Sequence, residues 1–134
     1  MGVAMKKFIK VTIIVLVLAT LFAGCGKSYD VSTKIGSFTL SPEIATSFAD
    51  YTPGEGKEFL LFTLNSADYS MTIDTMSEYF RPNEYSPGPQ AIVGGTTYDL
   101  KYIAYGKGTP PPCILIYEVP QGTKDLEAVT LELH

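Results

Sequence analysis

The chain has 134 residues, of which 46% are hydrophobic, and this length suffices for one domain with a modest core. Its 14 acidic residues outnumber its 10 basic residues and give a net charge of −4. This balance argues against nucleic acid as a partner, because such binding depends mainly on Lys and Arg. The single histidine is the terminal His134, so neither a histidine-based catalytic dyad nor a histidine-rich metal site is expected.

The chain begins with a cationic segment that turns apolar. Lys6, Lys7 and Lys10 lead into an apolar run over 11–23, and small residues then precede Cys25. This order is typical of a signal peptide. The run is shorter than the roughly 20 residues that a spanning helix needs, and no stop-transfer charges follow it. We therefore expect a signal helix within residues 1–24 that is removed on export.

The residues Leu-Phe-Ala-Gly-Cys at 21–25 resemble the lipobox of bacterial lipoproteins. The resemblance implies that Cys25 carries the lipid anchor, including acyl chains such as palmitate, and holds the protein at the extracytoplasmic face of the cell membrane. One departure is Phe22, which stands where the lipobox prefers an aliphatic residue. The alternative is an ordinary secretory signal in which Cys25 is incidental. With two acyl chains the anchoring would be stable, which makes the membrane the first expected partner.

Removal of residues 1–24 would leave an acidic chain. Three of the 10 basic residues and none of the 14 acidic residues lie in that segment, so the mature chain carries 7 basic and 14 acidic residues, a net charge of −7. Residues 25–28 then form the lipidated cysteine with a short linker, and residues 29–134 form the folded domain. Cys113 would be the one cysteine left unmodified, and its place in an apolar segment predicts a small core residue.

Short strands separated by turns are expected along the whole domain. In the first half, strands are predicted at 29–33 and 37–40, and 41–44 is either a helical turn after Ser41 or an extended segment. The segment 57–65 is the clearest strand, and both of its faces are apolar, which predicts a central position.

In the second half, a short strand is predicted at 71–74 and a long proline-containing loop at 79–90. Further strands are expected at 91–93, 97–105, 113–119 and 126–133. About seven strands without a long amphipathic helix predict an all-β, antiparallel β-sandwich.

Two segments support a family resemblance. The sequence PGEGKEFLLFTLN at 53–65, together with IYEVPQG at 116–122, is similar to a group of Gram-positive lipoproteins with an immunoglobulin-like extracellular domain of unknown function. The resemblance implies an immunoglobulin-like sandwich behind a lipobox. It carries no catalytic residues onto this chain.

The sequence contains no recognisable catalytic set. No glycine-rich phosphate loop and no nucleophile with a partner base are present, so no catalytic residue is assigned and no cofactor is expected. The nearest approach to an oxygen-ligand cluster is a group of three carboxylates, and the nearest to a sulfur site is two methionines with a cysteine. These groups are Asp68, Asp74 and Glu78, and Met71, Met76 and Cys113. Ordinary surface and core roles are favoured for both, so no metal is assigned.

One segment concentrates residue types that bind partners. Tyr79, Phe80, Arg81 and Tyr85 lie in a proline-rich stretch, and tyrosine and arginine often dominate interface energetics. They form the candidate binding loop. The alternative is that Tyr79 and Phe80 close the end of the sandwich while the prolines block edge pairing.

These observations favour a non-enzymatic, lipid-anchored module of the cell envelope. Its expected partner, besides the membrane, is an envelope protein or a wall polymer. The alternative is an envelope metal carrier or a hydrolytic enzyme whose site is not recognisable from the sequence.

Overall fold

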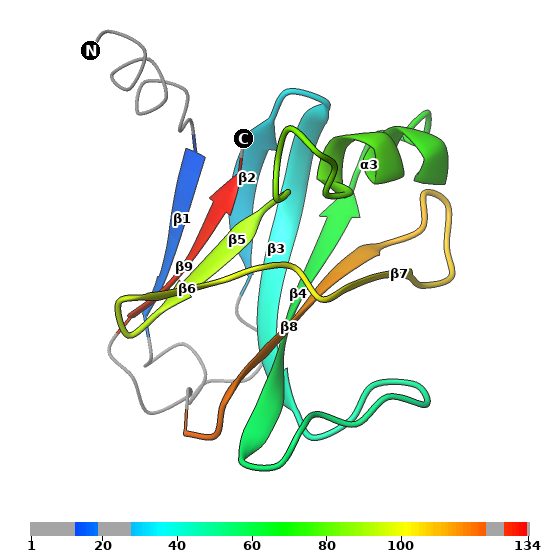
Figure 1. Ribbon diagram of the computed structural model, residues 1–134. Helices are drawn as coiled ribbons and strands as arrows, with labels where there is room; N and C mark the ends of the chain where they lie inside the picture. Colours follow the sequence, from blue (N-terminus) through cyan, green and yellow to red (C-terminus); the bar gives the residue numbers. More distant parts are fainter. Residues whose placement is uncertain (1–12, 19–27, 123–127, 134) are drawn as a thin grey trace, which may run out of the picture.

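The computed structural model describes residues 13–18, 28–122 and 128–133, and these form two antiparallel β-sheets and one short helix (Figure 1). The five-stranded sheet has the order β2-β3-β4-β8-β7. Its strands are β2 (Tyr29–Thr33), β3 (Gly36–Ala45), β4 (Lys57–Ser66), β8 (Cys113–Pro120) and β7 (Tyr102–Tyr105). The four-stranded sheet has the order β1-β9-β5-β6. Its strands are β1 (Ile13–Leu18), β9 (Ala128–Leu133), β5 (Gln90–Val93) and β6 (Thr96–Tyr98).

Strand β4 is central, as its two apolar faces predicted. It pairs with β3 on one side and with β8 on the other. Leu60, Phe62 and Leu64 point into the layer between the sheets, whereas Phe59 and Leu61 point to the outer face, and all five are buried. Alternation along a strand sends successive side chains to opposite faces, so this one strand contributes to two apolar clusters.

The main core lies between the two sheets. The five-stranded sheet contributes large side chains, including Phe62 and Tyr117, whose rings meet edge to face with centroids 5.7 Å apart. The four-stranded sheet contributes smaller groups, namely Ala91, Val93 and Leu131. The predicted all-β class with packed antiparallel sheets is therefore confirmed.

A second apolar cluster covers the outer face of the five-stranded sheet. Phe59, Leu61 and Ile116 form it, and Phe48 packs on it from the connection between β3 and β4. This connection extends from the end of the sandwich opposite to the helix (Figure 1). The cluster explains why Ile116 is buried although its neighbour Leu115 faces the main core.

Residues 71–74 do not form the predicted strand. Ile73 and Asp74 instead begin helix α3 (Ile73–Phe80), whose N-cap is Thr72. The Thr72 side chain accepts a hydrogen bond from the Thr75 backbone N–H at 3.1 Å, and Asp74 lies in the first turn, where the helix dipole favours negative charge. The predicted loop at 79–90 is consequently shorter, since Tyr79 and Phe80 belong to the helix.

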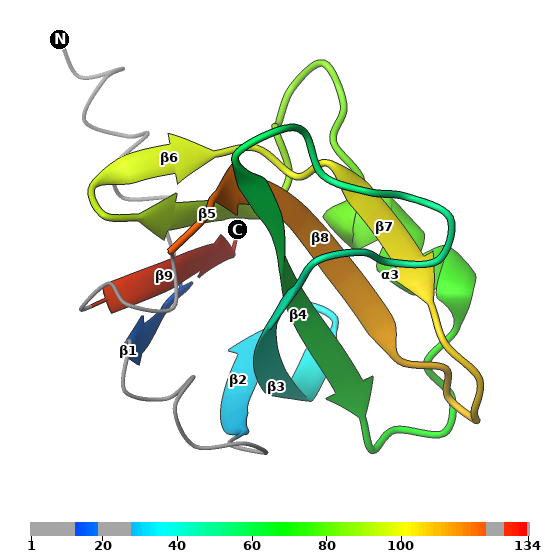
Figure 2. The same cartoon turned by 90° about the horizontal axis from the view of Figure 1, so that it is seen from below.

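Two further strand predictions need correction. The segment 97–105 is not one strand, because Thr96–Tyr98 pairs with β5 in one sheet and Tyr102–Tyr105 pairs with β8 in the other. The chain crosses between the sheets at 99–101 (Figure 2). Residues 41–44 are extended within β3, so the helical turn after Ser41 does not form. The last predicted strand, at 126–133, is observed as Ala128–Leu133, and residues 126 and 127 lie outside the described part.

Of the expected signal segment, only Ile13–Leu18 is described, and it is a strand rather than a helix. Its sequence, IIVLVL, is rich in β-branched residues that favour strands. Within the described residues, no helix is long and apolar enough to cross a membrane. The lipobox, including Cys25, and the terminal His134 lie outside the described residues.

Candidate functional site

The candidate site lies at the end of the sandwich where α3 sits. The helix follows β4 and leads through residues 81–89 into β5, so it belongs to the connection from the five-stranded to the four-stranded sheet and lies at one end of the sandwich (Figure 1). Met76 and Phe80 are fully buried on one side of α3, and the Phe80 ring meets Phe38 edge to face at 6.0 Å. This packing fixes the position of the helix and leaves its opposite side facing solvent.

The turn that leads into α3 is closed by Asp68. Its carboxylate oxygen Oδ1 accepts hydrogen bonds from the Ser70 hydroxyl at 2.6 Å and from the Ser70 backbone N–H at 2.9 Å. These hydrogen bonds lower the pKa of Asp68, because they favour its charged form. The turn leaves Tyr69 81% exposed beside the helix.

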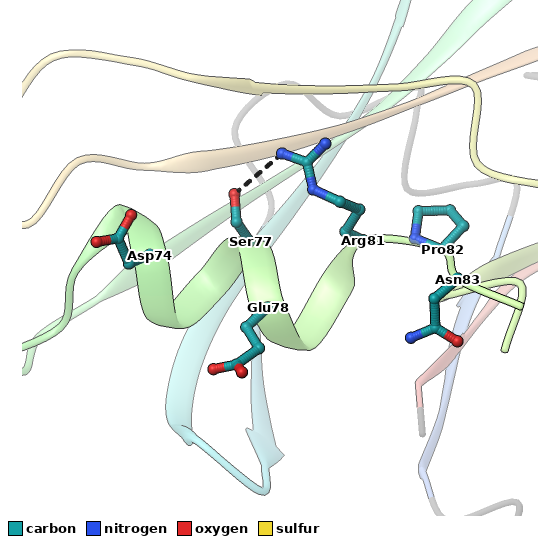
Figure 3. A pocket seen from close by; sticks show the side chains of 6 residues that line it. All are labelled: Asp74, Ser77, Glu78, Arg81, Pro82 and Asn83. Carbon is teal, nitrogen blue, oxygen red and sulfur yellow. Dashed lines mark hydrogen bonds between the residues drawn. The ribbon is translucent and has the colours of Figure 1, made fainter. Parts of the chain in front are cut away.

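The exposed side of α3 carries a shallow, open hollow of about 470 Å³ (Figure 3). Six residues line it, namely Asp74, Ser77, Glu78, Arg81, Pro82 and Asn83. An Nη2 atom of Arg81 lies 3.5 Å from Ser77 Oγ, a long contact, and Ser77 Oγ shares a hydrogen bond of 2.6 Å with the Tyr105 hydroxyl. The lining combines two carboxylates with one guanidinium, which suits recognition of polar groups.

The three carboxylates that the sequence analysis named as the nearest approach to an oxygen-ligand cluster are not brought together. Asp74 and Glu78 line the hollow, but Asp68 is occupied in its own turn with Ser70. In the part of the chain that the structure describes, no three His, Cys, Asp or Glu side chains are grouped as a metal site.

Residues 81–89 form a loop closed by its own hydrogen bonds. Asn83 and Ser86 exchange two backbone hydrogen bonds of 2.8 and 3.2 Å, and Asn83 Oδ1 accepts from the Tyr85 backbone N–H at 2.7 Å. Ser86 Oγ accepts from the Gly88 N–H at 3.1 Å. These local bonds give the loop one preferred conformation, in which Tyr85 points to solvent with 88% of its surface exposed.

The same loop is fastened to the core at both ends. Phe80, at its start, is buried, and the buried Pro89, at its end, accepts a 2.7 Å hydrogen bond from the Tyr117 hydroxyl to its carbonyl oxygen. Gly88 has φ +75°, and a Cβ at this position would lie 2.7 Å from the carbonyl oxygen of Phe80. Only glycine fits this close approach without rearrangement.

The four residues of the predicted binding loop divide between core and surface. Phe80 is fully buried, so it fills the core and is not part of a contact surface. Tyr79 is half-buried, and burial raises the pKa of its hydroxyl. Arg81 and Tyr85 are exposed. The alternative raised from the sequence, closure of the sandwich end, therefore describes Phe80 fully and Tyr79 in part.

The sequence interpretation missed two exposed apolar side chains at this end. Tyr69 lies in the turn before α3, and Ile73, in the first turn of the helix, is 43% exposed. In the described residues, the exposed large hydrophobic side chains are Tyr51, Tyr69, Ile73 and Tyr85, so three of the four flank or belong to α3. The exposure of Tyr69 could have been inferred from the sequence, because this residue stands between Asp68 and Ser70 in a segment with no alternating apolar pattern.

The sulfur-containing side chains belong to the interior. Met71, Met76 and Cys113 are all buried members of the main core. Burial raises the pKa of the Cys113 thiol to about 12, so the thiolate required of a nucleophile or a soft metal ligand is disfavoured. The prediction that Cys113 is a small core residue is confirmed.

Comparisons of this chain with protein-family models, with curated proteins and with solved structures gave no match.

Proposed function

We propose that this protein is a lipoprotein, anchored through Cys25 at the extracytoplasmic face of the cell membrane, that recognises another envelope protein with the α3 end of its sandwich. The α3 end means the exposed residues of 68–86 around the helix, chiefly Tyr69, Ile73, Arg81 and Tyr85. A wall polymer is the alternative partner. We propose binding and not catalysis as the activity.

The observation that carries the proposal is the exposure of Tyr85 on a loop that is already ordered. A side chain 88% exposed to water gains much apolar burial when a partner covers it, and its hydroxyl remains free for a hydrogen bond. Because Asn83 and Ser86 close the loop and Tyr117 holds its end, little conformational entropy is lost on binding. Rigid aromatic anchors of this kind concentrate binding energy in interfaces.

The composition of the α3 end favours a protein partner. Its exposed aromatic and aliphatic groups, Tyr69, Ile73 and Tyr85, are interspersed with charged groups such as Glu78 and Arg81. Exposed tyrosine and arginine side chains of this kind are enriched in protein interfaces.

We also propose that the sandwich is immunoglobulin-like in architecture but not in topology. The support is a pair of antiparallel sheets packed on one apolar layer in a domain of about 100 residues. The sequential order β2-β3-β4 within one sheet differs from the immunoglobulin strand order.

The proposal is tested by affinity capture from an envelope extract with the mature chain, residues 25–134 carrying Cys25→Ser. Tyr85→Ala should lose the captured protein. Tyr51→Ala is the matched control, because Tyr51 is also exposed, at 48%, and lies on the β3–β4 connection at the opposite end. Equal capture by both variants would contradict the proposed surface.

A further inference from the structure

Strand β1 occupies one whole edge of β9. The two strands pair antiparallel over six residues, from Ile13 opposite Leu133 to Leu18 opposite Ala128. The other edge of β9 is paired with β5. Strand β1 also contacts β2 of the opposite sheet, so it closes the side of the sandwich between β9 and β2, as both ribbon views show (Figures 1 and 2).

All of β1 lies within the segment 1–24 that export would remove. This step rests on the proposed function, because only a processed chain loses the strand. After cleavage, β9 becomes an edge strand whose backbone N–H and C=O groups on that side have no strand partner. Exposed edges of this kind pair readily with another extended chain.

The sequence of β9 gives this edge little protection, since Glu132 is the one charged residue in the strand. Proteins commonly block edge strands with lysine, proline or very short length. Strand β9 reads AVTLEL over six residues and contains neither lysine nor proline. By contrast, the edge strand β6 at the other side of the same sheet has only three residues.

We propose that in the mature protein the β9 edge binds an extended segment of a partner protein in the place that β1 occupies here. The structure indicates the chemistry of this segment, because β1 itself shows what the edge accepts: six uncharged, mainly β-branched residues running antiparallel to β9. Backbone hydrogen bonds give such strand addition its affinity, and the alternate side chains that face the core give it specificity. The side of the sandwich between β9 and β2 is then closed again.

The register allows a direct test by self-complementation. Because Ile13 lies opposite Leu133, a two-residue Asn-Gly turn placed after Leu133 and followed by the sequence IIVLVL would form a hairpin with β9 in the observed register. The test chain is the mature chain 25–133 with Cys25→Ser and this extension. Its matched control carries the same extension with proline at the third and fifth positions of the added strand.

The probe is a synthetic peptide of residues 11–20 with lysine tails, titrated into isotopically labelled mature chain and followed at the Thr130 and Leu131 amides. We expect binding at least tenfold tighter than that of the peptide with Val15→Pro and Val17→Pro. The self-complemented chain should not bind the peptide and should melt at a higher temperature than its proline control. If the unextended chain does not fold, folding of the self-complemented chain but not of its proline control is the expected result.

Equal affinity for the two peptides, or unchanged peptide binding by the self-complemented chain, would overturn the inference. Dimerisation of the mature chain through β9, seen by sedimentation and by protection of the same amides, would overturn it in favour of a second copy as the occupant. A negative result for strand addition at β9 would not contradict the proposed function, because Tyr85 and the α3 end take no part in these measurements. Lipid attachment to Cys25 is also measured separately.

Discussion

The hydroxyl of Tyr117 donates a buried hydrogen bond of 2.7 Å to the carbonyl oxygen of Pro89. It joins β8, in the middle of the core, to the end of the loop that displays Tyr85. Burial raises the pKa of Tyr117 well above its ordinary value, so the hydroxyl stays protonated and remains a donor. The conformation of the candidate contact loop is thus tied to the packing of the core.

Tyr117→Phe should both destabilise the domain and loosen this loop. The substitution keeps the ring but leaves the Pro89 oxygen without its donor in a buried place, which costs about 1–3 kcal/mol. Urea denaturation measures the loss, and hydrogen exchange should increase at residues 86–91. Tyr105→Phe, which removes a partly buried hydroxyl bonded to Ser77, is the control with the smaller expected effect. Equal exchange of the loop in both variants would show that Tyr117 does not hold it.

The two apolar clusters should both contribute strongly to stability. Phe62→Ala removes a fully buried ring from the main core and should cost about 3–5 kcal/mol, and Ile116→Ala, in the outer cluster, about 2–5 kcal/mol. Tyr69→Ala, at an exposed position, should stay within about 0.5 kcal/mol. Thermal unfolding of the three variants checks the ranking. An unchanged melting temperature for Ile116→Ala would mean that the outer cluster is not a packed layer.

Stability should decline at alkaline pH because of Cys113. Burial raises the pKa of its thiol from 9.0 to about 12, so between these values the unfolded chain releases a proton that the folded chain keeps. The free energy of unfolding should therefore be flat below about pH 8 and fall above pH 9, by at most about 1.4 kcal/mol per pH unit. Cys113→Ala should make the decline between pH 9 and 10 smaller but not abolish it, because Tyr79, Tyr105 and Tyr117, whose pKa values are also raised by burial, begin to contribute there. An identical decline in the variant would assign it to other groups.

Lipid attachment is predicted at Cys25. Cys25→Ser should abolish incorporation of labelled palmitate and leave the precursor unprocessed or wrongly processed, since the thiol is the acceptor. Metabolic labelling followed by electrophoresis measures both effects. Cys113→Ser serves as the control and should keep the label. Equal label in wild type and Cys25→Ser would place the anchor elsewhere or exclude one.

Strands were predictable from the sequence where the order of apolar and polar residues itself shows which faces of the strand are covered. The segment at 57–65 has two apolar faces, and only a strand covered on both sides has this pattern, so its central position followed from the sequence alone. Helix α3 was missed because it has only eight residues and is preceded by Met71 and Thr72, which continue the pattern of a strand. Its cap lacks the acidic third residue of a capping box, since Thr75 stands there.

The site was only partly predictable, because the sequence does not show which residues of a short helix face the core. Met76 and Phe80 are four positions apart and so share a buried side, which turns Arg81 and the following loop outward. Likewise, alternation from Tyr98 to Ala104 suggested one strand, and only tertiary packing sends its two ends to different sheets.

The central claim is that Tyr85 and Arg81 bind a partner and do not support the fold. The most direct measurement is the affinity of the partner captured by the mature chain for Tyr85→Ala and Arg81→Ala, with the melting temperature of each variant recorded in parallel. We expect each substitution to weaken binding by about 1 kcal/mol or more, while stability stays within about 0.5 kcal/mol because both side chains are exposed. Stability lost with affinity intact would contradict the claim and assign these residues to the structure alone.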